Sequence, residues 1–132
     1  MSLNIGVGDG KSLVPLPGEP SLSLDNDGYY WFLLSLFERL CAETGQMIDL
    51  YGDASFAGAS LTALERIVAE ARTMVLAKPE FWSVHVGTQV QPVRREVYEP
   101  VDREAFLALL DRWTHVIVRA EELGRPVVCF GD

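Results

Sequence analysis

The side chains most capable of chemistry gather around two candidate strands. Asp49, Tyr51 and Asp53 surround the end of one short segment of alternating apolar and polar residues, and His85 and Arg95 belong to a second such region. A carboxylate, an imidazole and a guanidinium suffice for acid–base chemistry when they line one cleft. One hypothesis is therefore a small enzyme or ligand-binding domain that uses a His85/Asp49/Asp53/Arg95 cleft. Charged residues on a solvated sheet face explain the same pattern equally well.

The motifs that bind nucleotides or calcium are incomplete in this chain. The glycine-rich run at residues 6–12 has Ile5 at the position where a phosphate-binding loop needs its first glycine. The segment Asp25–Gly28 would place Leu34 where a calcium loop needs a glutamate. We therefore expect no metal and no other cofactor, and the pattern favours a protein without catalytic activity.

Composition indicates a single folded domain over residues 1–132. The hydrophobic fraction of 48% is enough for a substantial core, yet no apolar stretch approaches the ~20 residues that cross a bilayer. No secretory signal is visible, so we expect a cytoplasmic protein that does not associate with a membrane. Cys41 and Cys129 lie among bulky apolar residues and are expected to be reduced thiols.

The chain is strongly acidic, with a formal net charge of −8. Lys11 and Arg39 are the only basic residues among the first 60. Such a balance repels the phosphates of nucleic acids and anionic lipids. It favours a basic protein partner, although solubility alone is an equally good explanation.

The elements that must position these residues can be read from hydrophobic periodicity. Six large apolar residues, Tyr29–Leu34, open an amphipathic helix, and the sequence leaves undecided whether Tyr29 or Trp31 is exposed. Three expected helices run over residues 28–43, from Thr62 in a capping box to about Pro79, and for about twenty residues after the cap Asp102. Either Asp25 or Asp27 is a plausible cap of the first helix, while Gly45 and Gly124 are expected to end the first and the third.

The expected strands are short. We predict one or two edge strands in the Gly/Pro-rich segment 1–24, at residues 3–7 and 13–16, a strand at 47–51 followed by a loop over 52–60, a hairpin of strands 82–86 and 93–97, and a final strand at 127–130. The predicted class is α+β, with three helices packed on a small, largely antiparallel sheet.

The order of these elements, with Leu50-Tyr51-Gly52 after the aromatic helix and Gly124–Val128 after the last helix, resembles that of small bacterial immunity proteins of polymorphic toxin systems. The resemblance implies a protein that binds a toxin domain and blocks it without doing chemistry. Acidic inhibitors of this kind often cover a basic substrate groove. The candidate binding residues are Asp25, Asp27, Asp49, Tyr51, Asp53, His85 and Arg95. A homodimer, with exposed aromatic residues at its interface, is a third hypothesis.

Overall fold

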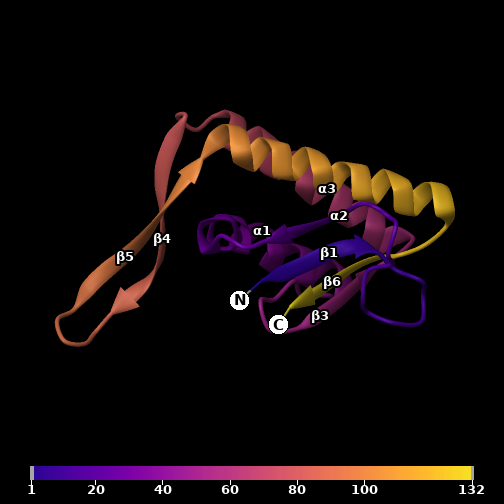
Figure 1. Cartoon of the computed structure of the whole chain (residues 1–132), viewed down its shortest axis with the longest axis horizontal. Helices are drawn as coiled ribbons and strands as arrows, with labels where there is room; N and C mark the ends of the chain where they lie inside the picture. The colour runs from indigo at the N-terminus through magenta and orange to yellow at the C-terminus, as the bar shows by residue number, and fades with distance from the viewer. Residues whose placement is uncertain (1, 132) are drawn as a thin grey trace.

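The computed structural model describes residues 2–131 and has an α+β architecture, as the sequence predicts (Figure 1). Within these residues, three helices accompany two antiparallel sheets, of four strands and of two. The strands are β1 (Leu3–Val7), β2 (Ser21–Leu24), β3 (Asp53–Phe56), β4 (Phe81–Gln89), β5 (Arg95–Asp102) and β6 (Val127–Gly131), and the helices are α1 (Asp27–Thr44), α2 (Ala59–Leu76) and α3 (Arg103–Leu123). None of the described helices is long and apolar enough to cross a membrane.

The core lies between the helices and one face of the four-stranded sheet, whose strand order is β2-β1-β6-β3. The register places Ile5 opposite Leu22 on one side and opposite Cys129 on the other. Because side chains alternate along a strand, these residues share one face, and all three are buried in the core. Cys41 and Cys129 are both free thiols, as expected, with Cys129 buried and Cys41 half-buried.

The N-terminal segment differs from the prediction. The strand at residues 3–7 forms, but it is an interior strand between β2 and β6 and not an edge strand. Residues 13–16 form no strand. They belong to a loop that folds back over the outer side of the sheet, where the Leu16 amide donates to the Val7 carbonyl at 2.8 Å. Prolines in this loop cannot donate to a ladder, which explains why it covers the sheet without extending it.

The predicted strand at residues 47–51 is wrong, since this segment forms a turn. The Asp49 side chain accepts a hydrogen bond from the Tyr51 amide at 3.1 Å, and the Gly52 amide donates to the Asp49 carbonyl at 3.4 Å. Aspartate favours turns because its side chain can bond to the backbone two residues on. The strand that pairs with β6 is β3, within the segment expected to be a loop.

Two helix starts also differ from the prediction. The cap of α1 is Asn26, and neither Asp25 nor Asp27 caps it, because the Asn26 side chain accepts from the Gly28 amide at 2.7 Å. Helix α2 begins at Ala59, before the expected capping box, and the Thr62 hydroxyl donates to the Gly58 carbonyl within that first turn. By contrast, Asp102 caps α3 as predicted, and Gly45 and Gly124 end α1 and α3 in the left-handed conformation.

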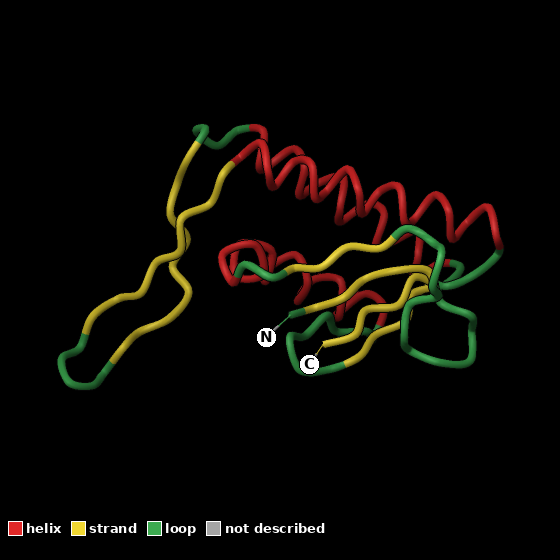
Figure 2. Tube along the Cα trace, viewed as in Figure 1, coloured by secondary structure: helices red, strands yellow, loops and turns green. Residues whose placement is uncertain are grey.

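The hairpin of β4 and β5 forms as predicted, with longer strands, and projects from the body as an arm (Figures 1 and 2). We call residues 81–102 the arm, its end at residues 90–94 the tip, and the end that joins the helices the foot. Trp82 anchors the foot, with its ring 5.6 Å from that of Phe32 and 6.3 Å from that of Phe106. Beyond the foot, β4 and β5 pair only with each other among the described strands.

Candidate functional site

The turn at residues 49–53, which we call the acidic turn, presents one aromatic side chain between two carboxylates. Tyr51 is 69% exposed, and Asp49 and Asp53 are also exposed. The side chains of Ile48, just before the turn, and Leu50, within it, are buried in the core. The alternation of buried aliphatic and exposed polar residues fixes which side chains point outward.

The backbone of the acidic turn is held on both sides by hydrogen bonds. The Tyr30 hydroxyl, in α1, donates to the Ile48 carbonyl at 2.9 Å, and the Gly131 amide, in β6, donates to the Gly52 carbonyl at 2.9 Å. A side-chain carbon at Gly131 would stand only 2.4 Å from the Leu50 carbonyl oxygen. This close approach requires glycine at position 131, so β6 packs directly against the turn.

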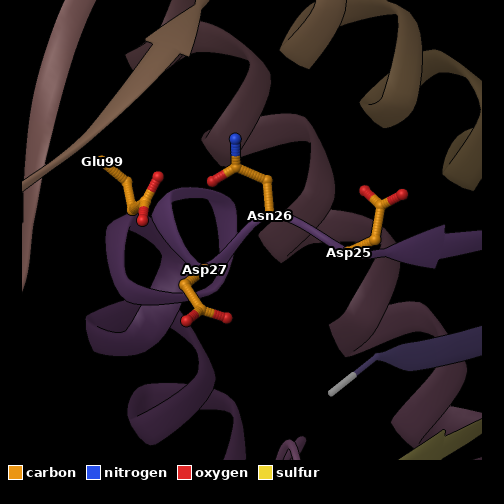
Figure 3. A pocket seen from close by; sticks show the side chains of 4 residues that line it. All are labelled: Asp25, Asn26, Asp27 and Glu99. Carbon is orange, nitrogen blue, oxygen red and sulfur yellow. The ribbon is translucent and has the colours of Figure 1, made fainter.

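A second acidic surface lies at the start of α1, beside the arm. Asp25, Asn26, Asp27 and Glu99 line a hollow of about 380 Å³ (Figure 3). The Asn26 side chain already caps α1, so three carboxylates give the hollow its charge. Burial, together with the nearby carboxylates of Asp25 and Asp102, raises the pKa of the Tyr29 hydroxyl. We call this surface the acidic hollow.

The polar residues of the arm pair with one another. His85 Nε2 contacts Glu96 Oε2, and the Thr88 hydroxyl donates to the same oxygen at 2.9 Å. These two hydrogen bonds, that of Thr88 first, lower the pKa of the Glu96 carboxyl. Arg95 Nε donates to the Gln89 side chain at 3.1 Å, also across the hairpin.

The structure does not bring together the four residues of the hypothetical His85/Asp49/Asp53/Arg95 cleft. Asp49 and Asp53 lie in the acidic turn next to the four-stranded sheet, while His85 and Arg95 lie on the separate two-stranded arm. The hypothesis required the arm to lie beside the acidic turn. Among residues 2–131, no group of three or more histidine, cysteine, aspartate or glutamate side chains is placed to hold a metal ion.

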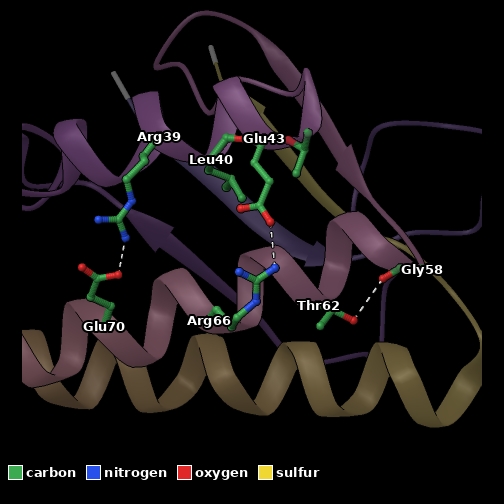
Figure 4. A network of polar contacts seen from close by, with 8 residues as sticks. Arg39, Leu40, Glu43, Gly58, Thr62, Arg66 and Glu70 are labelled. Carbon is green, nitrogen blue, oxygen red and sulfur yellow. Dashed lines mark hydrogen bonds and ion pairs between the residues drawn. The ribbon is translucent and has the colours of Figure 1, made fainter.

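Many basic side chains of the helices are already paired with acidic ones. Arg66 of α2 donates to Glu43 of α1 at 2.8 Å, and Arg39 of α1 contacts Glu70 of α2 (Figure 4). These pairs are exposed, so each contributes little to the free energy of unfolding. These pairs mainly affect the distribution of charge. Because the arginines are neutralised by their partners, the carboxylates of the acidic turn and the acidic hollow dominate the surface charge.

Sequence reasoning missed Glu99 and left the aromatic residues of α1 undecided. Glu99 lies far along the chain from Asp25 and Asp27, and only the packing of β5 beside the start of α1 joins them in one hollow. Trp31 is 41% exposed, whereas the Tyr29 ring packs 4.6 Å from the Phe106 ring. The alternation of apolar and polar residues along β5 was the one sequence signal that could have indicated which way Glu99 points.

No protein-family model, curated protein or solved structure matches this chain.

Proposed function

We propose that this protein is a non-catalytic binding module that attaches to a basic protein and inhibits it, in the manner of bacterial immunity proteins. The observation that carries the proposal is the acidic turn, where Tyr51 stands 69% exposed between Asp49 and Asp53 on a rigid backbone. An exposed tyrosine on a rigid support is a typical anchor of a protein interface.

The energetics of such a turn suit a tight and selective contact. A tyrosine has few rotatable bonds, and the turn is held from α1 and β6, so little conformational entropy is lost when a partner binds. Trp31, which is 41% exposed on α1, is a second exposed aromatic ring. Aromatic anchors supply affinity in this arrangement.

The carboxylates define the chemistry of the partner. Asp49 and Asp53 flank the anchor, and the net charge of −8 draws a basic surface toward the molecule from a distance. A substrate groove lined with lysine and arginine, as in an enzyme that cleaves nucleic acid, has the complementary charge. A protein seated there by Tyr51 would exclude the substrate, which is the action that the resemblance to immunity proteins implies.

The test is retention of a partner from the native host by immobilised protein at low salt, followed by calorimetry with the retained protein. We expect the dissociation constant to rise about 30-fold or more for Tyr51→Ala, because loss of an anchor costs about 2 kcal/mol or more. The double variant Asp49→Asn/Asp53→Asn should bind more weakly, and its affinity should depend less on salt.

Two matched controls separate this surface from the rest of the molecule. Tyr98→Ala removes another exposed tyrosine, on the arm, and Glu65→Gln/Glu121→Gln removes two exposed carboxylates where α2 and α3 meet. Both should leave affinity for the partner unchanged. The proposal fails if no protein is retained at low salt, or if Tyr51→Ala binds as tightly as the wild type.

A further inference from the structure

The arm is a two-stranded ribbon whose outer half is open to solvent. Of its apolar side chains, Phe81 is 65% exposed, Val90 68%, Val93 69% and Tyr98 56%. An isolated two-stranded ribbon is marginally stable in water and leaves unpaired backbone groups along both edges. A strand added to one edge would satisfy the unpaired backbone groups of that edge.

The charges along β5 are complementary to those of a second β5 that runs in the opposite direction. Arg95, Val97 and Glu99 are alternate residues, so they share one face of the strand, with opposite charges on either side of a valine. If a second β5 runs antiparallel with the two Val97 residues opposite each other, Arg95 of each copy stands opposite Glu99 of the other. Opposite charges directly across an antiparallel pair stabilise that register.

We propose that the protein forms a two-fold symmetric homodimer in which β5 of each copy pairs antiparallel with β5 of the other, centred on Val97. The two arms then build a four-stranded sheet in the order β4-β5-β5-β4. The inference does not rest on the proposed function, since the acidic turn is not part of this contact.

The backbone of β5 supports this edge and limits its length. Pro100 is paired with Ser83 of β4, and a proline is accommodated in a strand when its nitrogen faces away from the ladder. Glu96 and Tyr98, which alternate with Pro100 in the same phase, therefore turn their backbone groups to the outer edge. These groups pair with the second copy, and Pro100 ends the new ladder just beyond Glu99.

The two ends of the arm are complementary in charge. Arg94, at the tip, has a side chain that is 78% exposed, and its contact with Glu96 is long, at 3.8 Å. The foot carries the acidic hollow, with Asp25 and Asp27 beside Glu99. In the antiparallel arrangement the basic tip of each copy lies at the acidic hollow of the other, so the symmetric dimer makes this contact twice.

The same arrangement pairs apolar side chains. Val90 and Val93 lie in the tip, and Phe81 lies at the foot, opposite Asp102 of β5. Antiparallel alignment about Val97 brings the tip of one arm to the foot of the other. The two Val97 side chains then face each other, and both Tyr98 residues lie near the symmetry axis on the other face of the sheet.

The test is the molar mass in solution, measured by light scattering and by sedimentation at low salt. We expect the wild type to have twice the 14.7 kDa mass of the chain. A tip-reversed variant, Arg94→Glu/Arg95→Glu, and a foot-reversed variant, Asp25→Lys/Glu99→Lys, should each be monomeric. Like charges then meet at both contacts, which should raise the dimer dissociation constant about 100-fold or more.

Mixing the two variants gives the sharpest result. The tip-reversed chain is acidic at both ends of the arm, and the foot-reversed chain has a net positive charge at both ends, although Asp27 remains. Each variant is therefore opposed to itself and complementary to the other. We expect an equimolar mixture to form a heterodimer with both contacts restored. Lys11→Glu/Arg125→Glu, which makes the same change of charge away from the arm, should stay dimeric, and circular dichroism of every variant should match that of the wild type.

A monomeric wild type at low salt would overturn the inference and would leave the arm to a different protein. It is also overturned if the reversed variants remain dimeric, or if the mixture of two folded variants stays monomeric. None of these results bears on retention of a basic partner by the acidic turn, so the two proposals can fail separately.

Discussion

Gly131 shows how a single residue positions the candidate binding surface. An added side-chain carbon there would lie 2.4 Å from the Leu50 carbonyl oxygen and 2.6 Å from the Asp49 carbonyl oxygen, and both atoms are backbone. Real side-chain carbons do not approach backbone atoms so closely, and therefore the acidic turn would have to move. The geometry of Tyr51 depends on the absence of a side chain in β6.

We predict that Gly131→Ala lowers the free energy of unfolding by about 1–3 kcal/mol, the usual cost of forcing extra volume into a packed site. The measurement is urea unfolding, with amide exchange at Gly52 reporting on the turn.

Gly87→Ala on the arm is the matched control for this substitution. An added carbon at Gly87 meets no other atom of the described residues within 4 Å, so this variant should be neutral or slightly stabilising. Equal stability of Gly131→Ala and the wild type would contradict the close contact.

Capping residues were predictable where a single candidate exists and not where several compete. Asp102 and Gly124 were assigned correctly, because a cap is decided by chemistry within one helical turn. At the start of α1, three neighbouring residues can all accept a hydrogen bond from the backbone. The choice of Asn26 depends on the packing of Gly28, where an added carbon would lie 2.8 Å from Val101 of the arm.

At the scale of elements, the contact between α2 and α3 contains a pair of like charges. Glu121 of α3 lies close to Glu65 of α2, and the interaction with the Glu65 carboxyl, followed by burial, raises the pKa of Glu121 from its ordinary value of 4.5. A raised carboxyl pKa means that the folded state holds its proton more tightly than the unfolded state does. Protonation of Glu121 therefore stabilises the folded state. This contribution to the free energy of unfolding is full below about pH 4.5 and is lost as the pH rises through the pKa of Glu121 in the folded state.

We predict that Glu121→Gln unfolds at a higher temperature than the wild type at pH 7, because it removes one of the two facing carboxylates. The difference should shrink as the pH falls, because Glu121 of the wild type then takes up a proton. Thermal unfolding across this pH range measures the effect. Glu122→Gln is the control, since Glu122 contacts Arg119 and its substitution should give no gain at pH 7.

Strand positions were harder to predict than strand existence. The arm was recognised because its alternation and its turn are local, while β3 was placed one segment too early. Residues 47–51 alternate as a strand does, but the Asp49 turn prevents pairing there, and Ala54 and Ser55 match β6 in register. Which segment pairs with β6 depends on a strand at the far end of the sequence, which local patterns do not encode.

At the scale of the whole molecule, the sheet depends on its first strand. β1 pairs with both β2 and β6, so it is the link that joins the edge strand β2 to the rest of the sheet. Its residues Leu3, Ile5 and Val7 are fully buried. This central position was not predicted, because glycines and prolines around β1 indicated an edge.

We predict that deletion of residues 1–7 abolishes cooperative unfolding, because it removes three core side chains and both ladders of β1. Circular dichroism and denaturant titration would show a flat, non-cooperative transition. Deletion of the exposed residues 11–13 from the neighbouring loop should leave a cooperative transition. A cooperative transition in the chain without β1 would show that the remaining strands suffice.

The adjacency of β1 and β6 also affects how the protein is made. While the ribosome is still synthesising α3, a nascent chain has β1 and β2 but not β6, the other neighbour of β1. The sheet can close only after the codons for Val127–Gly131 have been translated, so we expect one edge of β1 to stay unpaired and open to chaperones until then. Pairing between the two ends of the sequence also implies slow folding relative to helical proteins of this size.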